Sequence, residues 1–146
     1  MINNEYKRDM KVMKFGGTSV GSPSRMKEVT NLVVSYNEPV FVVLSAMSGT
    51  TNSLVEISDY LYKKNPEGAN EVINKLENKY MAHINELYET KEWQDITRSF
   101  LKEEFNFIRT FTKELFTSFE EKVIVAQGEI ISTNMVANYM KEKGFN

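Results

Sequence analysis

Two short runs of strand-forming residues, 12–15 and 40–44, are separated by a single stretch with helical periodicity. The second run, VFVVL, is continuously apolar, which is typical of a strand covered on both faces of a parallel sheet. Between the two runs, Ser22 and Pro23 form a helix-start signal, and apolar residues recur at helical spacing as far as Tyr36. This order predicts a βαβ unit, and therefore an α/β fold with an open, mainly parallel sheet and flanking helices.

The middle of the chain has helical patterns in place of strand patterns. A helix is expected from near Asn52 to about Lys64, followed by an apolar stripe from about residue 69 to 88. A second stripe runs from about residue 92 to 119. The two stripes predict a long helical hairpin at about 69–119 whose apolar residues form core. The second stripe consists of Trp93, Ile96, Phe100, Phe107, Phe111 and Leu115.

The last segment, residues 123–143, is helical in its apolar spacing and precedes Gly144, a favoured residue just past a helix end. In an alternating α/β chain such a helix normally leads into another strand, but only Phe145 and Asn146 follow it here. We therefore expect residues 1–146 to be one part of a longer domain.

Composition excludes several classes of partner. The chain has 146 residues, 41% of them apolar, which suffices for one domain with a core. Eighteen basic residues against 20 acidic ones give a net charge of −2, so no basic field predicts binding to nucleic acid or to a membrane. No run approaches the ~18 apolar residues of a membrane span, and the N-terminus lacks the apolar core of a signal peptide. We expect a cytoplasmic protein.

Thiol chemistry is excluded because the chain contains no cysteine. Its single histidine, His83, has no carboxylate or second histidine at i+4 to form a ligand pair. We predict a surface or boundary position for His83 and assign no metal ligand to any residue.

The end of the first strand has the composition of an anion site. Lys14 precedes two adjacent glycines, Gly16 and Gly17, and a helix follows. Glycines let backbone N–H groups approach an oxyanion, and the positive end of a helix favours negative charge. The spacing from Gly16 to Gly21 is that of a Walker motif, but the Lys-Ser/Thr pair of that motif does not follow. A phosphate-binding lysine and an ordinary strand lysine before a βα turn both fit this pattern.

A second polar cluster, SAMSGTTN at 45–52, follows the second strand, at the edge where open α/β sheets bind ligands. Two such loops would line one cleft, although taken alone this loop is explained better as one that only caps the next helix. A third feature is Gly128, which costs about 1 kcal/mol relative to alanine inside a helix. Close approach of a ligand or a helix-packing contact would explain it. The next residue, Glu129, is expected to be a buried carboxylate.

Three motifs occur in order: "KFGGTSVG" at 14–21, "VVLSAMSGTTNSLVE" at 42–56 and "QGEIIST" at 127–133. Together they closely resemble the aspartokinase branch of the amino-acid kinase family. The resemblance implies a sheet that binds ATP and L-aspartate side by side. The side-chain carboxylate of aspartate would attack the γ-phosphate to give 4-phospho-L-aspartate, the first step towards lysine, threonine and methionine. Mg²⁺ would bridge the ATP phosphates.

Carried over residue by residue, the resemblance gives Lys14 the catalytic role of contacting the transferring phosphate. It implies that aspartate is held by Ser45, Thr51 and Glu129, with Glu129 accepting from the α-ammonium group. The ATP phosphates would be bound by Lys14, Gly16, Gly17, Thr18 and Ser19.

The resemblance covers only the amino-terminal, substrate-side part of such a kinase domain. The nucleotide-binding half and the regulatory ACT domains of the family have no counterpart within residues 1–146. We therefore expect this chain to be inactive by itself and to form a homodimer. The alternative is a free-standing α/β interaction or dimerisation module with a vestigial phosphate loop.

Overall fold

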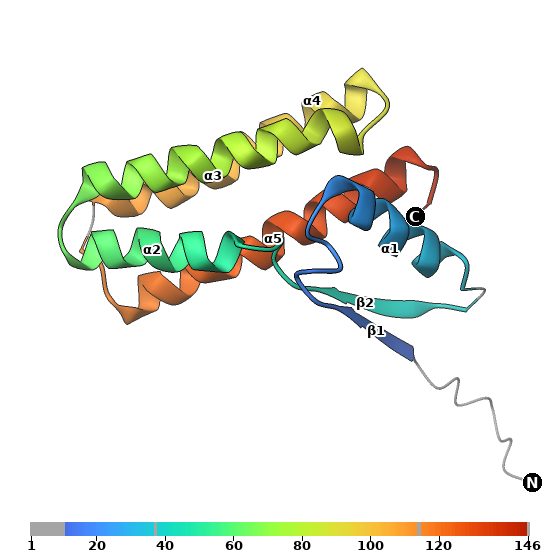
Figure 1. The fold of residues 1–146 in the computed structure, drawn as a ribbon, viewed down its shortest axis with the longest axis horizontal. Coiled ribbons are helices and arrows are strands. Elements are labelled where there is room, and N and C mark those ends of the chain that lie inside the picture. Colours follow the sequence, from blue (N-terminus) through green and yellow to red (C-terminus); the bar gives the residue numbers. More distant parts are fainter. Residues whose placement is uncertain (1–10, 37, 114, 146) are drawn as a thin grey trace, which may run out of the picture.

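The protein is described by a computed structural model that covers residues 11–36, 38–113 and 115–145. Within these residues a βαβ unit comes first and a group of long helices follows (Figure 1). The elements are β1 (Lys11–Phe15), α1 (Pro23–Val34), β2 (Val40–Leu44), α2 (Thr50–Tyr62), α3 (Pro66–Leu87), α4 (Lys91–Thr110), a 3₁₀ turn (Phe111–Lys113) and α5 (Ser118–Glu142).

The two strands form a parallel sheet in which Lys11 pairs with Val40 and Phe15 with Leu44. This confirms the predicted βαβ unit and the α/β fold with flanking helices. Ser22 caps α1 as predicted, because its Oγ accepts from the Arg25 backbone N–H at 3.4 Å and Pro23 occupies the first helical position.

The prediction that β2 is covered on both faces is wrong for the described residues. Phe41 is 58% exposed and Val43 is 47% exposed, whereas Val42 packs against the core. Side chains alternate along a strand, so one face of the sheet meets the core and the other is open. Figure 1 shows α1 on one side of the sheet, with α5 behind it. The apolar run reflects two apolar faces, of which this part of the chain covers one.

Helices α2, α3, α4 and α5 lie side by side and enclose most of the core (Figure 1). The largest fully buried side chains include Tyr80 and Tyr88 from α3 and its C-terminal end, and Phe105 from α4. The Tyr80 and Phe105 rings lie 5.9 Å apart in a tilted arrangement. Helices α3 and α4 therefore form the predicted hairpin.

The second helix of the hairpin ends earlier than predicted, at Thr110 in place of about residue 119. Helix α5 correspondingly begins at Ser118, several residues before the predicted start at 123. The break is stabilised by a capping box in which the Thr117 and Glu120 side chains bond each other's backbone groups. A threonine followed three residues later by a glutamate is visible in the sequence and marks this boundary.

The predicted apolar stripe of α4 is rotated from the face that is buried. Ile96 and Phe107 are each 42% exposed, and Trp93 and Phe100 are only partly buried. Helix α4 packs against both α3 and α5. The face of α4 that meets these two helices lies next to the predicted stripe. The aromatic side chains of the stripe therefore lie at the edge of the buried face. The fully buried residues of α4 are Thr97, Leu101, Phe105 and Ile108.

His83 occupies the predicted boundary position. Its side chain is partly exposed, but both ring nitrogens are buried and have no hydrogen-bond partner among the described residues. Burial lowers the pKa of His83, the Glu86 carboxylate acts in the opposite direction, and the Lys79 ammonium lowers the pKa further.

This shift predicts that the folded chain loses stability in mild acid. Because the pKa of His83 is lower in the folded state, the unfolded chain takes up the proton first as the pH falls below about 6.5. The stability that depends on a neutral His83 is therefore fully present above that pH, and it is lost as the pH falls towards the folded-state pKa. We expect the urea midpoint to fall between about pH 7.5 and pH 5.5. In His83→Gln the fall should be smaller, and equal slopes in the two proteins would contradict this account.

Within the part of the chain that the structure describes, no helix is both long enough and apolar enough to span a bilayer.

Candidate active site

The turn after β1 brings its backbone very close to the loop after β2. The Ser19 backbone N–H donates to the Gly16 carbonyl oxygen at 2.9 Å and closes the turn. A Cβ added at Gly17 would lie 2.8 Å from the Ala46 carbonyl oxygen, whereas one added at Gly16 would meet nothing within 4 Å. Packing therefore requires glycine at position 17 and leaves the space beside Gly16 open.

The β2–α2 loop, residues 45–49, continues from the carboxyl end of β2. The Ser45 backbone N–H donates to the Phe15 carbonyl oxygen at 3.0 Å, which extends the strand pairing into the loop. The Ser48 Oγ donates to the Gly17 carbonyl oxygen at 2.9 Å and ties this loop to the turn after β1. Gly49 has a φ of +82°, a conformation that favours glycine, and it precedes α2 without a side-chain cap.

Helix α5 packs directly onto the β2–α2 loop at Gly128. A Cβ added there would lie 2.7 Å from the Ala46 Cβ and 3.3 Å from side-chain atoms of both Leu54 and Thr50. Of the two explanations for a glycine in this helix, the helix-packing contact is therefore correct. The close contact brings the neighbouring Glu129 to the loop, where its Oε1 accepts from the Ala46 backbone N–H at 3.4 Å.

Ser132 also holds the β2–α2 loop, and the sequence did not predict this role. Its side chain is fully buried, and its Oγ donates to the Ser45 carbonyl oxygen at 2.7 Å. The signal was a hydroxyl three positions after Glu129, on the same face of the helix. Ser132 thus fixes the residue at which the loop begins.

These segments surround one open hollow of about 440 Å³. Five of the eight predicted site residues line it, while Lys14, Gly16 and Ser19 do not. Glu129 is exposed on its wall, so the prediction of a buried carboxylate is wrong within the described residues. The lining residues are Gly17, Thr18, Ser45, Ala46, Met47, Ser48, Gly49, Thr51, Asn52 and Glu129.

Lys14 lies outside the hollow, on the open face of the sheet. It is exposed, it is the next-to-last residue of β1, and it pairs in register with Val43 of β2. No hydrogen bond or ion pair of its ammonium group is found within residues 11–36, 38–113 and 115–145. The ammonium group is therefore accessible at the edge of the sheet where both loops emerge.

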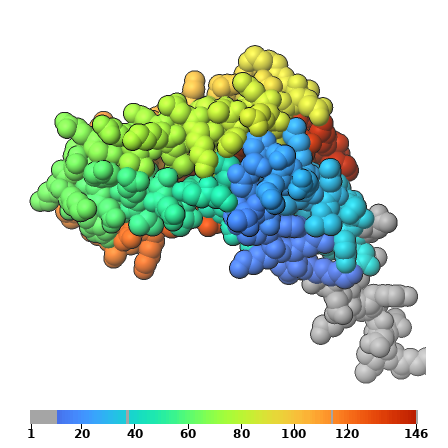
Figure 2. All heavy atoms as spheres, in the orientation of Figure 1, coloured from blue at the N-terminus to red at the C-terminus, as the bar shows by residue number. Residues whose placement is uncertain are grey.

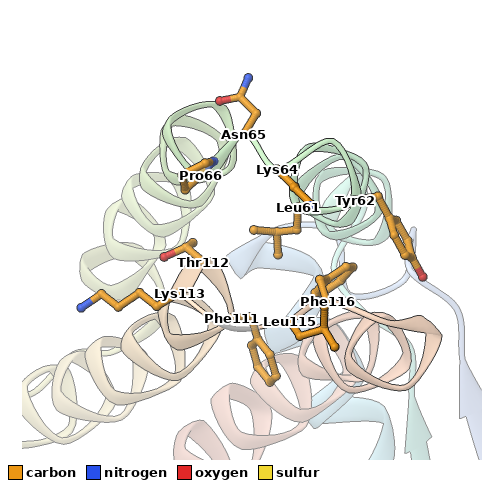
Figure 3. Close-up of a pocket in the computed structure, with 10 residues that line it drawn as sticks. All are labelled: Leu61, Tyr62, Lys64, Asn65, Pro66, Phe111, Thr112, Lys113, Leu115 and Phe116. Carbon is orange, nitrogen blue, oxygen red and sulfur yellow. The ribbon is translucent and has the colours of Figure 1, made fainter.

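A second hollow, of about 330 Å³, lies at the other end of α2 from the sheet (Figures 1 and 3). It is mainly apolar, with Leu61, Phe111 and Phe116 among its lining residues and the lysines Lys64 and Lys113 at its rim. Its described lining residues include no carboxylate. This hollow is separate from the loops that follow β1 and β2.

The fold and the site define a class of protein: a parallel α/β protein whose polar hollow lies at the carboxyl ends of two neighbouring strands. A sequence model of the amino acid kinase family matches residues 9–146. The chain belongs to the amino acid kinase family.

Several known proteins are similar to this chain. Aspartokinase 1 of the Arabidopsis thaliana chloroplast is 35% identical over 137 residues, which cover 91% of this chain and 24% of the relative. The bifunctional aspartokinase/homoserine dehydrogenase of Buchnera aphidicola is 27% identical over 150 residues, 94% of this chain and 18% of the relative.

Two solved structures of Escherichia coli aspartokinase III have the same fold. The complex with lysine and aspartate superposes with a TM-score of 0.80 at 25% identity, over 94% of this chain and 30% of that chain. The complex with aspartate and ADP gives a TM-score of 0.74 at 25% identity, over 93% and 30%. The chain thus spans less than a third of the length of these proteins.

Proposed function

We propose that this chain forms the aspartate-binding part of an ATP-dependent aspartate kinase, which makes 4-phospho-L-aspartate. The observation that carries the proposal is the meeting of Ser45, Thr51 and Glu129 around one hollow beside the Gly17 turn. Support also comes from the likeness to aspartokinase III, whose solved complex contains aspartate and ADP. The activity belongs to amino-acid biosynthesis, as the step that leads to lysine, threonine and methionine.

The proposed reaction needs orientation and charge more than acid–base chemistry. The side-chain carboxylate of aspartate is already ionised at neutral pH. One of its oxygens forms a bond to the γ-phosphorus of ATP, the bond from that phosphorus to the β,γ-bridging oxygen breaks, and ADP leaves with the electron pair. No proton has to move in this step. The chain's task is to hold the two substrates in line and to stabilise the charge that spreads over the phosphate oxygens.

Each proposed role matches the chemistry of its side chain. The Ser45 and Thr51 hydroxyls donate hydrogen bonds to the aspartate carboxylates. The Glu129 carboxylate accepts from the α-ammonium group, which distinguishes an amino acid from a simple diacid. Lys14 supplies a compact positive charge to the transferring phosphate, and the backbone N–H groups of Gly16 and Gly17 assist it.

Mg²⁺ is expected to accompany the nucleotide. Glu129 is the only carboxylate among the described residues that line the hollow, whereas Mg²⁺ requires several oxygen ligands in octahedral geometry. The lining residues therefore do not form a magnesium site by themselves. We propose that the ATP phosphates and water provide its ligands.

The proposal also states which part of the whole enzyme binds each substrate. Residues 1–146 would be the substrate-side part of the kinase domain, and a nucleotide-binding half would complete it. We place the enzyme in the cytoplasm, where ATP is available. The full-length protein should release ADP in an aspartate-dependent manner in a coupled assay, and the chain of 146 residues should release none. Turnover by this chain alone, or none by the full-length protein, would refute the proposal.

A homodimer is the second part of the proposal. The open face of the sheet exposes Val12, Phe41 and Val43, and exposed apolar side chains that lie together favour association. The alternative, a free-standing interaction or dimerisation module, would instead use the apolar stripe of the helical hairpin, where Ile96 and Phe107 are exposed. Sedimentation of the chain should show a dimer, and a monomer at all concentrations would contradict the assembly.

Glu129→Gln provides a test of substrate specificity. The substitution removes the negative charge that faces the α-ammonium group of aspartate, a charge-assisted interaction worth ~1.5–3 kcal/mol. In the full-length protein we expect the KM for aspartate to rise about tenfold or more, while the KM for ATP changes little. Glu121→Gln is the matched control, because Glu121 lies on the same helix and accepts from the Tyr62 hydroxyl at 2.8 Å, outside the site. Equal effects on both substrates would indicate a packing role.

A further inference from the structure

Two consecutive side chains of helix α3 contact the β2–α2 loop and the first residue of α2. The Lys79 Nζ donates to the Ser48 carbonyl oxygen at 2.8 Å. The Tyr80 hydroxyl lies 2.7 Å from the Thr50 Oγ1. Consecutive residues of a helix point about 100° apart, so the two side chains reach the loop on either side of Gly49.

The segment from Ser48 to Thr50 also has contacts other than those to α3: the Thr50 backbone N–H donates to the Met47 carbonyl oxygen at 2.9 Å, and the Ser48 Oγ donates to the Gly17 carbonyl oxygen at 2.9 Å. Gly49 has a positive φ and lacks a side chain, and α2 begins after it without a side-chain cap. Glycine is the residue that loses the most conformational freedom on folding. The two contacts from α3 fix the residues before and after it, and Thr51, a proposed aspartate ligand, comes next in the chain.

The environment of Tyr80 directs its hydroxyl to Thr50 and its ring into the core. Its ring is fully buried and packs against Phe105, which leaves the hydroxyl as its polar attachment to the loop. Burial raises the pKa of Tyr80 to about 12, so the hydroxyl remains protonated at neutral pH. Thr50 is also fully buried, and loss of either partner would leave the other hydroxyl without a hydrogen bond.

We propose that Lys79 and Tyr80 are positioning residues that hold the β2–α2 loop and the first turn of α2 in the shape required by the aspartate site. What the loop binds rests on the proposed function. That α3 holds the loop rests on the contacts alone. The helical hairpin is therefore a support for the site as well as core.

Tyr80→Phe tests this role, with Tyr88→Phe as a matched control. Tyr88 is also buried beside α3, but its hydroxyl donates to the Met135 carbonyl oxygen, away from the loop. In the chain, we expect Tyr80→Phe to speed amide hydrogen exchange at residues 49–52 about tenfold, as for loss of one hydrogen bond. In the full-length protein the KM for aspartate should rise by a similar factor with kcat nearly unchanged. Tyr88→Phe should change neither.

Lys79→Met provides a second test that does not disturb the core, because Lys79 is exposed. We expect the same pattern at a smaller size, partial recovery in Lys79→Arg, and no effect in Lys75→Met, one helical turn earlier. Unchanged exchange at residues 49–52 in both Tyr80→Phe and Lys79→Met would overturn the inference. Faster exchange with an unchanged KM in an active enzyme would also overturn it. If the variants exchange faster but the unsubstituted full-length protein has no aspartate kinase activity, the result would support the holding role and refute the proposed function.

Discussion

Lys14→Ala in the full-length protein is expected to lower kcat at least about a hundredfold, an effect of ~3 kcal/mol. Lys14 places an accessible ammonium group at the carboxyl end of β1, beside the Gly16 and Gly17 turn. In phosphoryl transfer, negative charge spreads over the phosphate oxygens, and removing a cation aimed at them raises the barrier. Steady-state kinetics with both substrates would measure the effect. The KM for aspartate should change little, because other residues are proposed to bind it.

Lys11→Ala is the control for this experiment. Lys11 lies on the same strand, but at its other end, where its Nζ pairs with a Glu38 carboxylate oxygen at 2.9 Å. An exposed pair of this kind contributes little to stability. We expect near-normal kcat in Lys11→Ala. A Lys14→Ala enzyme with near-normal kcat would refute the proposed role of Lys14.

Gly17→Ala is expected to lower the free energy of unfolding by ~1–3 kcal/mol, as overpacking does. The new Cβ would lie 2.8 Å from the Ala46 carbonyl oxygen, and neither atom can rotate away, because the backbone fixes the position of both. The two loops that carry the site would be pushed apart, including the bond from the Ser48 Oγ to the Gly17 carbonyl oxygen. Activity of the full-length protein should fall at least about tenfold, because small misplacements of substrates slow transfer strongly.

Gly16→Ala, at the adjacent position, is the control. It makes the same glycine-to-alanine change where the new Cβ has no close neighbour. A Cβ at Gly16 would meet nothing within 4 Å, and Gly16 is not among the described glycines with positive φ. We expect its free energy of unfolding, measured by urea denaturation, to match that of the unsubstituted chain to within ~0.5 kcal/mol. Equal destabilisation by the two substitutions would contradict the close approach at Gly17.

The βαβ unit was predictable because its signals are local. The apolar run of β2 and the Ser22–Pro23 start of α1 each identify an element from neighbouring residues. The buried face of α4 was not predictable in the same way. Its sequence carries adjacent apolar faces, and contact with both α3 and α5 selects the one that includes Leu101 and Phe105.

In the site, too, features encoded locally were predictable, and features set by contacts between distant segments were not. Polar loops after β1 and β2 predicted one shared hollow, because the carboxyl ends of parallel strands meet at one edge of a sheet. The exposure of Glu129 and the contacts of Ser132, Lys79 and Tyr80 depend on how α3 and α5 approach those loops. No local pattern encodes that approach.

The contacts of the β2–α2 loop also differ in when they become available during synthesis. Its bonds to Tyr80 and Lys79 join residues 30 and 31 positions apart, whereas those to Glu129 and Ser132 join residues 83 and 87 positions apart. At ~5–20 residues per second, about 4–17 s pass between the making of Ala46 and the making of Glu129. Lys79 and Tyr80 are made 50 and 49 residues before Glu129, about 2–10 s earlier at the same rate, so α3 becomes available to the loop before α5 does.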